Sequence, residues 1–452
     1  MNEEDARKKI ILFAVTGKPI LHSLSPQMQN AAFMASGIDA IYTRLAVENA
    51  DDVLRSAKAL GIFGLNVTSP FKEEIAKLCD TLDEDAKKTG AVNTVILNRN
   101  GTVSGFNTDV TGVMETLATS GIEIAGKNAL IIGAGGAAKA AVVALMNKGA
   151  KVTIANRTFE KAEQLAEKFG CEAIDISELN NVDGVVPHAD IIISAITSGG
   201  SQNERIIPHE LLKRGTIVLD ANYSSESALV RDAKTAGCKV IDGREWLLHQ
   251  GAAAFSLFTG KDAPIEMMRT ALYSHCTTAK TAGKPNIALI GFMGSGKTTT
   301  AKEIAKISGM NCSDIDENIE RKTGTKIKEI FENHGEMKFR DMEKKEVTAI
   351  NGTTNSVIAC GGGAILDHEN VEILLKNCTV VWLTASPKTI FERIGKDESR
   401  PLLNVADREG VAQRIIERRI PLYARTADIV VNTDGKSARE VAEQIASEVL
   451  RG

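Results

Sequence analysis

The sequence predicts an α/β protein organised in three units. Its 452 residues exceed what a single hydrophobic core of ordinary size organises, and the length corresponds to roughly three domains. Short apolar runs alternate with helical patterns along the chain, as they do where helices pack on a parallel sheet. Two glycine-rich loops, at 133–138 and 291–298, each lie between an apolar run and a helical pattern.

The composition excludes several classes of protein. Apolar residues make up 43% of the chain, charged residues 25%, and the net charge is -4, so no basic excess indicates a nucleic-acid partner. The N-terminal residues mix both charge signs without an apolar core, and no apolar run approaches the roughly 20 residues of a membrane span. The seven cysteines form no C-x-x-C pair, which favours neither a disulfide framework nor a zinc site. We therefore expect a cytoplasmic protein without nucleic-acid or membrane partners, and the oligomeric state stays open.

Residues 1–125 are expected to form an α/β lobe with several polar loops. Ser25-Pro26 has the form of a helix N-cap followed by proline at the first helical position. In a second loop, Thr68 or Ser69 is expected to cap a helix that begins at Pro70, which places Lys72 in its first turn. A helix N-terminus already carries partial positive charge, so a lysine cation is disfavoured there. A lysine that gives up its proton easily is suited to proton transfer, although most lysines at such positions are merely solvated.

Two more polar positions of this lobe each end a short apolar stretch, Asn93 and the run Asn107-Thr108-Asp109. Asp109 precedes a helical pattern, and acidic residues are favoured at helix starts. By itself the pattern therefore leaves two alternatives for Asp109, a capping role and a functional role.

The second predicted lobe, 126–241, opens with a dinucleotide-binding fingerprint. An apolar strand at 128–132 is followed by Gly133-Ala134-Gly135-Gly136-Ala137-Ala138, a helix to Lys148 and a second strand at 151–155. This G-x-G-x-x-[GA] pattern in a βαβ unit predicts a Rossmann lobe whose glycines approach a pyrophosphate. The second strand ends in Asn156-Arg157-Thr158, with Lys161 beyond, where an acid would bind the 2'-hydroxyl of NAD. Cationic residues suit a 2'-phosphate instead, so NADPH is the expected cofactor.

The third unit is expected over 286–452, after a linker at 273–285 that lacks apolar periodicity. Its first strand, 286–290, leads into a sequence that fits G-x-x-x-x-G-K-[ST], the phosphate-binding loop of ATP-binding proteins. Lys297 is expected to neutralise the outer phosphates and Thr298 to bind Mg²⁺ through its hydroxyl. The expected ATP-binding residues of this loop are Gly291, Gly294, Ser295, Gly296, Lys297, Thr298 and Thr299.

Residues 10 to about 270 resemble the shikimate dehydrogenase family. The motifs that carry the resemblance are His22-Ser-Leu-Ser-Pro26, Asn66-Val-Thr-Ser-Pro-Phe-Lys72, Ala91-Val-Asn-Thr94, Asn107-Thr-Asp109, the glycine fingerprint, Asn156-Arg-Thr158 and Gln250-Gly-Ala-Ala-Ala-Phe255. The resemblance implies that Lys72 and Asp109 form the catalytic pair and that 242–272 return as helices to the first lobe. It implies substrate contacts from Ser23, Ser25, Asn66, Thr68, Asn93, Tyr223 and Gln250, and NADPH contacts from Gly133, Ala134, Gly135, Gly136, Ala137, Asn156, Arg157, Thr158 and Lys161.

This sequence departs from the family pattern at three positions. Val110 stands where the family usually has glycine, Ile196 where it has threonine, and Ser225 where it has proline. The resemblance places two of these positions near the nicotinamide, so we expect any consequence for turnover and cofactor geometry more than for the fold.

Residues 286–452 resemble shikimate kinase. Beyond the phosphate loop, the motifs are Asp314-Ile-Asp316, Phe339-Arg340-Asp-Met-Glu343, Gly361-Gly-Gly363, Arg400-Pro-Leu-Leu403 and Arg419-Ile-Pro-Leu-Tyr423. The resemblance implies that Asp314 holds Mg²⁺, that Asp316 and Arg400 are catalytic, and that Arg393 stacks on adenine. It assigns the substrate to Arg340, Gly361, Gly362, Gly363 and Arg419.

Together the two resemblances imply a bifunctional enzyme that reduces 3-dehydroshikimate to shikimate with NADPH and then phosphorylates shikimate with MgATP. Two alternatives remain at this stage. The first part could accept quinate, or the chain could be a ligand-sensing regulator that has lost catalysis. The retained Lys72, Asp109, Lys297 and Asp316 argue against the second alternative.

Overall fold

The computed structural model describes residues 10–196, 204–223, 225–274, 284–394 and 407–450. Contacts between Cα atoms divide the chain into two compact units. The first unit gathers Met1–Pro26, Asp39–Phe63 and Thr277–Gly452, and the second gathers Gln27–Ile38 and Gly64–Cys276. Among the described residues, no helix is long and apolar enough to cross a membrane.

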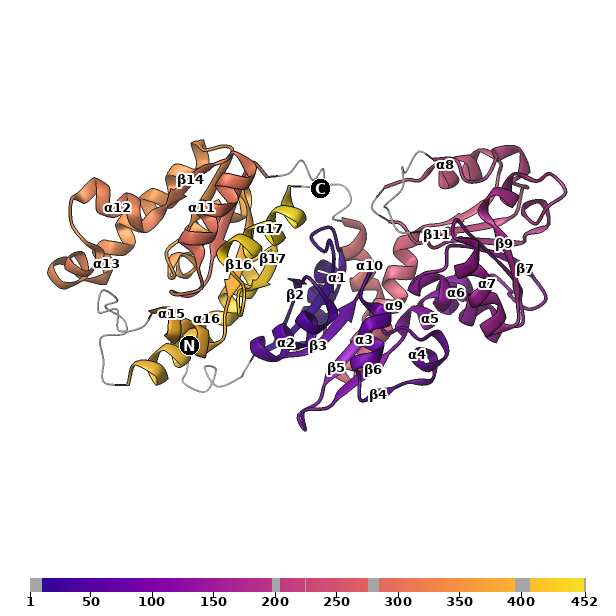
Figure 1. The fold of residues 1–452 in the computed structure, drawn as a ribbon, viewed down its shortest axis with the longest axis horizontal. Helices are drawn as coiled ribbons and strands as arrows, with labels where there is room; N and C mark the ends of the chain where they lie inside the picture. Colours follow the sequence, from indigo (N-terminus) through magenta and orange to yellow (C-terminus); the bar gives the residue numbers. More distant parts are fainter. Residues whose placement is uncertain (1–9, 197–203, 224, 275–283, 395–406, 451–452) are drawn as a thin grey trace. The chain divides into compact units, whose positions relative to one another are not determined.

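The first unit is built on a parallel sheet in which the strands lie in the order β14-β15-β13-β16-β17-β2-β1 (Figure 1). The strands β13, β15 and β17 are buried along their whole length, as expected of strands covered on both faces. Their bounds are β1 Ile11–Gly17, β2 Ala40–Ala46, β13 Asn286–Ile290, β14 Asn311–Asp314, β15 Ser356–Ala359, β16 Cys378–Thr384 and β17 Ile429–Asn432. The helices are α2 Ala50–Leu60, α11 Lys297–Ser308, α12 Ile315–Thr323, α13 Ile327–Thr348, α14 His368–Asn377, α15 Pro387–Ile394, α16 Arg408–Thr426 and α17 Ala438–Val449.

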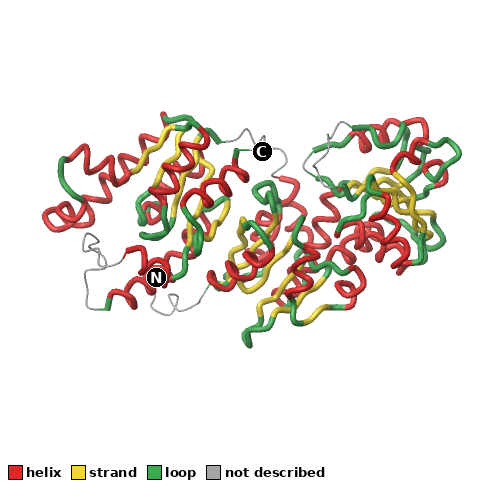
Figure 2. Tube along the Cα trace, viewed as in Figure 1, coloured by secondary structure: helices red, strands yellow, loops and turns green. Residues whose placement is uncertain are grey.

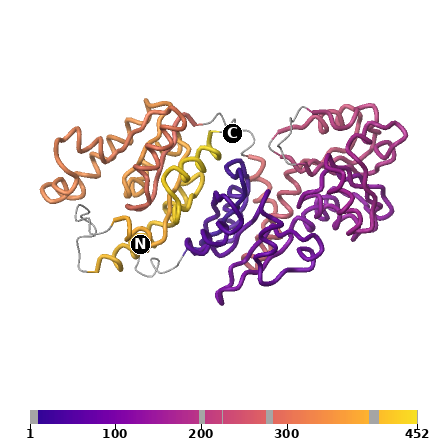
Figure 3. The backbone as a smooth tube through the Cα atoms, viewed as in Figure 1, coloured from indigo at the N-terminus to yellow at the C-terminus, as the bar shows by residue number. Residues whose placement is uncertain are grey.

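Within this sheet, strands from opposite ends of the chain are neighbours. β17 pairs in parallel with β2, with Val430 opposite Leu45 and Val431 opposite Ala46. Figure 3 shows the yellow C-terminal segment running beside the indigo N-terminal one. The sheet of the phosphate-loop domain therefore continues into the first two strands of the chain.

The second unit contains a six-stranded parallel sheet in the order β12-β11-β10-β7-β8-β9. The strand order reverses between β7 and β10, which is the switch point of a Rossmann lobe. Ile131 and Ile132 of β7 belong to separate hydrophobic cores, one formed with α5 (Thr108–Thr119), α6 and α7 and the other with α8 and short 3-10 turns. Figure 2 shows helices on both sides of this sheet. The elements are β7 Asn128–Ile132, α6 Gly136–Asn147, β8 Lys151–Asn156, α7 Phe159–Phe169, β9 Glu172–Asp175, β10 Ile191–Ser194, β11 Ile217–Asp220, α8 Ala228–Thr235 and β12 Lys239–Ile241.

The same unit also holds most of the remaining strands and helices, and it takes in α1 from Gln27 and β3 from Gly64. β5 pairs in antiparallel fashion with β3 and with β6, and β4 pairs in parallel with β6. The strands are β3 Ile62–Val67, β4 Thr81–Leu82, β5 Thr94–Leu97 and β6 Val103–Phe106, and the helices are α1 Ser25–Ala35, α3 Lys72–Leu78, α4 Glu84–Thr89, α5 Thr108–Thr119, α9 Gly243–Thr259 and α10 Ile265–Ser274.

The predicted α/β class, with a Rossmann lobe and a parallel sheet behind the phosphate loop, is confirmed. One detail is wrong: the helix expected from Pro70 begins at Lys72, and its N-cap is Phe71 without a side-chain cap. The Phe71 N–H donates to the Thr68 carbonyl at 3.1 Å, so residues 68–71 form a turn ahead of the helix. Most of the expected linker, 275–283, lies outside the described residues.

Candidate active sites

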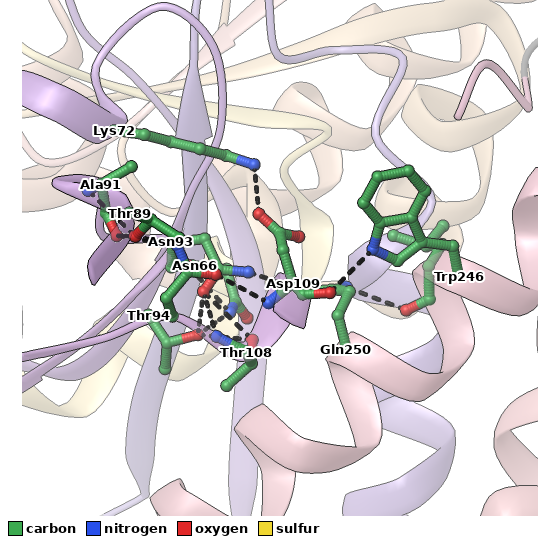
Figure 4. Close-up of polar contacts among 12 residues, drawn as sticks. Asn66, Lys72, Thr89, Ala91, Asn93, Thr94, Thr108, Asp109, Trp246 and Gln250 are labelled. Atoms are coloured by element: carbon green, nitrogen blue, oxygen red, sulfur yellow. Dashed lines mark hydrogen bonds and ion pairs between the residues drawn. The ribbon is translucent and has the colours of Figure 1, made fainter. Parts of the chain in front are cut away.

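Lys72 and Asp109 form a close ion pair. The Lys72 Nζ lies 2.6 Å from Asp109 Oδ2, and the side chains are only 14% and 9% exposed (Figure 4). Lys72 is the first residue of α3 and Asp109 lies in the first turn of α5, so the two helix starts meet here. A lysine ammonium held by one carboxylate and shielded from bulk water is suited to proton transfer.

A network of buried amides and hydroxyls holds the start of α5. Asn93 Oδ1 accepts hydrogen bonds from the backbone N–H of Thr108 at 2.7 Å and from its hydroxyl at 3.1 Å. The Asn66 side-chain amide donates to the Asn93 carbonyl and to the Thr94 hydroxyl (Figure 4). Because β3, β5 and β6 are neighbours in the sheet, these positions converge beside Asp109. This network therefore holds the start of α5, on which Asp109 follows Thr108.

Helix α9 closes this side of the site. Trp246 donates its indole N–H to the Asp109 carbonyl at 3.2 Å, and the Asn93 amide donates to Gln250 Oε1 at 3.4 Å. A Cβ on Gly112 would lie 2.8 Å from both Trp246 and Gln250, so glycine allows α5 and α9 to approach. We did not predict the contact of Trp246 with Asp109. A buried indole needs a partner for its N–H, but the sequence does not show which carbonyl supplies it.

Lys72 shares a cavity of about 340 Å³ with the fingerprint loop. A Cβ on Gly136 would lie 3.1 Å from Lys72 Cδ, so this glycine gives the lysine stem room. Thr68 and Ile196 also line the cavity, whereas Val110 is fully buried in the hydrophobic core. Of the three departures from the family pattern, Ile196 is thus exposed to whatever occupies this space, and Val110 is a packing residue.

A larger cavity of about 680 Å³ has a basic lining. Arg157 and Lys161, the two cations predicted to meet a 2'-phosphate, line it, and Lys139 and Lys168 add two cations that were not predicted. Lys139 forms an ion pair with Glu73 at 2.7 Å. Asn156 donates from its side-chain amide to the Thr158 carbonyl, which shapes the turn after β8. The lining suits an anionic ligand, and periodicity alone could not have found Lys168 because it lies on the exposed face of α7.

Three further predicted substrate residues lie in other segments of the chain. Ser23 and Ser25 are buried side chains of the first unit, and the Ser25 N–H donates to Ser23 Oγ at 3.4 Å. Tyr223 is partly buried in the second unit, shortly after β11.

The phosphate loop has the expected geometry. Gly291, Gly294 and Gly296 all have positive φ, and a Cβ on Gly291 would lie 2.2 Å from the Leu383 carbonyl oxygen. Lys297 begins α11 and donates to the carbonyls of Gly291 and Phe292 at 2.9 and 3.0 Å. The loop therefore forms a backbone cradle at a helix N-terminus, as phosphate binding requires.

The predicted magnesium residues lie together beside this cradle. Thr298 donates its hydroxyl hydrogen bond to Asp314 Oδ2 at 2.6 Å, and Asp314 Oδ1 caps α12 through the N–H groups of Asp316 and Glu317. Hydroxyl and carboxylate oxygens are the ligand types that Mg²⁺ prefers. The pair fits a magnesium ion held together with phosphate oxygens.

A second set of charged groups surrounds the glycines at 361–363. A Cβ on Gly361 would lie 2.3 Å from Glu343 Oε1 and 3.1 Å from Asp316 Oδ1. Arg340 donates to Glu343 Oε2 at 2.6 Å, and a Cβ on Gly363 would reach the Arg340 guanidinium at 2.4 Å. A side chain at 361 or 363 would therefore displace the charged ends of Glu343 or Arg340.

Arg419 and Tyr423 complete this set from α16. Both donate to the Gly362 carbonyl, at 3.1 and 2.6 Å, and burial raises the pKa of Tyr423 to about 12. Burial also raises the pKa of Glu343, although Arg340 opposes this. Glu343 lies in one of the motifs that resemble shikimate kinase, but it is not among the predicted site residues. Glu343 follows Arg340 by three residues on one helix, a spacing at which side chains meet, and this spacing could have indicated the ion pair.

Two other predicted residues of this domain have different outcomes. Arg393 lies on α15 and donates to the Gly294 carbonyl and to the Thr433 hydroxyl, so it lies against the phosphate loop. Arg400 lies outside the described residues.

Comparisons with known families divide the chain in the same order as its motifs. Models of the shikimate dehydrogenase substrate-binding domain, of shikimate/quinate 5-dehydrogenase and of the shikimate 5'-dehydrogenase C-terminal domain match residues 15–95, 116–218 and 243–273. The shikimate kinase model matches residues 293–450.

Individual relatives agree with the family models. Shikimate dehydrogenase (NADP⁺) of Pyrococcus abyssi is 44% identical over 259 residues, which are 57% of this chain and 96% of that protein. The Thermus thermophilus enzyme, solved with NADP(H) and shikimate, is 33% identical with a TM-score of 0.54, over 59% of this chain and 99% of that one. Quinate dehydrogenase of Corynebacterium glutamicum, solved with NAD, is 29% identical with the same TM-score of 0.54, over 59% and 99% of the two chains.

Proposed function

The chain belongs to the shikimate dehydrogenase family and carries a C-terminal shikimate kinase domain, and from this premise we propose that it catalyses two consecutive steps on one substrate. The first is the NADPH-dependent reduction of 3-dehydroshikimate to shikimate. The second is the MgATP-dependent phosphorylation of shikimate to shikimate 3-phosphate. The hydroxyl that the first step creates is the one that the second step phosphorylates.

The observation that carries the reductase proposal is the Lys72–Asp109 pair at the edge of the cavity that the fingerprint loop lines. NADPH bound there would supply a hydride to the ketone carbon. The Lys72 ammonium would donate a proton to the oxygen that becomes the alkoxide, and Asp109 would hold the ammonium in place. Asn66 and Asn93 would orient the substrate hydroxyls, together with Ser23, Ser25, Thr68, Tyr223 and Gln250.

The charge of the larger cavity supports a preference for NADPH. Arg157 and Lys161 line the basic cavity, and Glu73 is its only acidic lining residue among those described. A 2'-phosphate would be bound there by charge-assisted hydrogen bonds, which an unphosphorylated ribose does not make. The residues proposed to hold the cofactor are Gly133, Ala134, Gly135, Gly136, Ala137, Asn156, Arg157, Thr158 and Lys161.

In the kinase domain, Asp316 is proposed to accept the proton of the attacking hydroxyl, with Arg340 and Arg419 binding the substrate carboxylate. Gly361, Gly362 and Gly363 are proposed to contact the substrate, and the first and third of them lie against the charged side chains of Glu343 and Arg340. Thr298 and Asp314 would hold Mg²⁺, which neutralises phosphate charge during transfer. Lys297 and Arg400 would stabilise the transferred phosphoryl group, and Arg393 would contact adenine.

The ATP contacts are proposed for Gly291, Gly294, Ser295, Gly296, Lys297, Thr298, Thr299 and Arg393. We also propose the division into a substrate lobe over 1–125 completed by 242–272, a cofactor lobe over 126–241, a linker over 273–285 and a kinase domain over 286–452. These boundaries follow the motifs, whereas the compact units follow contacts.

A second candidate for the first step is quinate oxidation. The similarity to quinate dehydrogenase of Corynebacterium glutamicum supports this candidate, but that protein was solved with NAD and the turn after β8 here is cationic. The basic cavity therefore favours an NADP-linked reductase. A regulator without catalysis is disfavoured by the paired Lys72 and Asp109.

The proposal is tested by two assays on the purified chain. NADPH oxidation with 3-dehydroshikimate tests the first step, and ADP release with shikimate and MgATP tests the second. Parallel assays with quinate and NAD⁺ test the alternative. Turnover by both proposed assays supports the function, and turnover only with quinate and NAD⁺ would replace the first step by quinate oxidation.

A further inference from the structure

The loop between β1 and α1 is bound at one end by the last helix of the chain. Glu448 on α17 is 4% exposed, and its Oε2 accepts hydrogen bonds from the backbone N–H groups of Ile20 and Leu21 at 2.7 and 3.3 Å. Ile20 is fully buried and Leu21 is partly buried, so the Ile20 N–H has little access to water. The sequence separations of 428 and 427 residues mean that only the tertiary structure brings this acceptor to the loop.

The other end of the loop is bound through Arg44 of β2. The Arg44 guanidinium donates twice to the Ser23 carbonyl, at 3.0 and 2.6 Å, and once to the Asp428 carbonyl at 3.2 Å. Within the loop, the Ser23 N–H donates to the Ile20 carbonyl at 3.0 Å. Hydrogen bonds thus run continuously from Glu448 through Ile20 and Ser23 to Asp428. Both ends of this chain of contacts lie in the segment that matches shikimate kinase.

Strand pairing and buried polar contacts near this loop hold β17 against β2. β17 continues the sheet onto β2, and the Asn432 amide donates to the Ser56 hydroxyl at 3.1 Å. Lys436 lies 2.7 Å from Asp52, whose side chain is 1% exposed. Burial opposes ionisation of Asp52, but Lys436 and Arg55 together hold its pKa below the ordinary value. Because breaking a buried pair is costly, the register of β17 against β2 is well specified.

We propose that Glu448 and Arg44 are positioning residues for the dehydrogenase, and that the kinase domain thereby holds the loop carrying Ser23 and Ser25 in its substrate-binding shape. This inference rests on the proposed reductase function, in which those two serines contact the substrate. Glu448 itself does not touch the substrate. It acts by satisfying two backbone donors only a few residues before Ser23.

The inference predicts that Glu448 affects only the reductase activity, although it lies in the segment that matches shikimate kinase. In the full-length protein, Glu448→Ala should raise the KM for 3-dehydroshikimate by about tenfold, the effect expected when buried donors lose their acceptor. The KM for NADPH, the reductase kcat and both kinase KM values should remain at wild-type levels. Glu448→Gln should restore most of the affinity, because its amide oxygen can still accept from Ile20 and Leu21.

Glu443→Ala is the matched control. Glu443 lies on the same helix, is exposed, and pairs only with Arg439 among the described residues. Arg44→Lys provides a second, independent variant, since lysine keeps the charge but cannot bridge Ser23 and Asp428 as a planar fork does. It too should raise the KM for 3-dehydroshikimate selectively.

The outcomes separate the two levels of the proposal. A wild-type chain without reductase activity would refute the proposed function before any variant is compared. An active wild type, with Glu448→Ala and Arg44→Lys indistinguishable from Glu443→Ala, would overturn the positioning role. Equal loss of both activities with a lowered Tm would also overturn it, because that result means general destabilisation.

Discussion

The sharpest test of the reductase site removes the Lys72 ammonium and keeps its stem. In Lys72→Met, the unbranched side chain can still pack over Gly136, where a Cβ would lie 3.1 Å from Lys72 Cδ. What disappears is the group 2.6 Å from Asp109 Oδ2, which leaves a carboxylate of 9% exposure without this cation. The substitution therefore isolates the charge and the transferable proton.

The magnitude follows from these two losses. A positioned acid contributes roughly 10²- to 10⁴-fold to the rate, so the reductase kcat should fall by at least about 10²-fold. The hydride donor is bound by other residues, so the KM for NADPH should change by less than about threefold. Kinase kcat and KM should match the wild type, because Lys72 lies in a different catalytic domain.

The assay is steady-state NADPH oxidation, followed on the same preparation by ADP release with shikimate. Lys77→Met is the control, since Lys77 lies on the same helix and is exposed. A reductase kcat within about threefold of wild type would refute the assignment of Lys72 as proton donor. A matching fall in the Lys77→Met variant would assign the effect to the helix and not to the ammonium.

Three further predictions concern the other charged groups. Arg157→Ala should raise the KM for NADPH by about ten- to a hundredfold, because that factor corresponds to a charge-assisted hydrogen bond to phosphate. The KM for NADH should stay unchanged. Equal changes with both coenzymes would exclude a contact of Arg157 with the 2'-phosphate. Asp316→Asn should lower kinase kcat by at least about 10²-fold while calorimetry gives an unchanged Kd for ATP, with exposed Glu317→Gln as control; a fully active Asp316→Asn would remove Asp316 from the mechanism. Burial raises the pKa of Glu343, so the folded chain holds that proton more tightly than the unfolded chain and loses stability as pH rises from the ordinary glutamate value through the raised one. The Tm of wild type should therefore fall relative to that of Glu343→Gln over this window, and parallel Tm curves would contradict the raised pKa.

The sequence by itself determined the features that depend on a few consecutive residues. The phosphate loop and the Rossmann fingerprint could be predicted because glycine is needed at left-handed backbone positions and close approaches, such as Gly291 against Leu383. The cationic turn after β8 is equally local, since Asn156, Arg157 and Thr158 are adjacent. The alternation of strands and helices followed from hydrophobic periodicity, which is a property of single elements.

The helix that carries Lys72 shows where local reasoning fails. Thr68-Ser69-Pro70 has the composition of a helix start, but the helix begins two residues after Pro70, behind a cis peptide bond. Capping preferences act through small free energies, and the surrounding structure can outweigh them.

Only the tertiary structure decided which distant groups meet. Lys72 and Asp109 are 37 residues apart, and their contact depends on the packing of two helix starts beside one sheet. Trp246 reaches the Asp109 carbonyl because Gly112 lets α5 and α9 approach, and Glu343 and Asp316 both lie against Gly361. The pairing of β17 with β2 and the contact of Glu448 with Ile20 join opposite ends of the chain. Such contacts arise from strand order and helix packing between distant segments, which residue spacing along the chain does not fix.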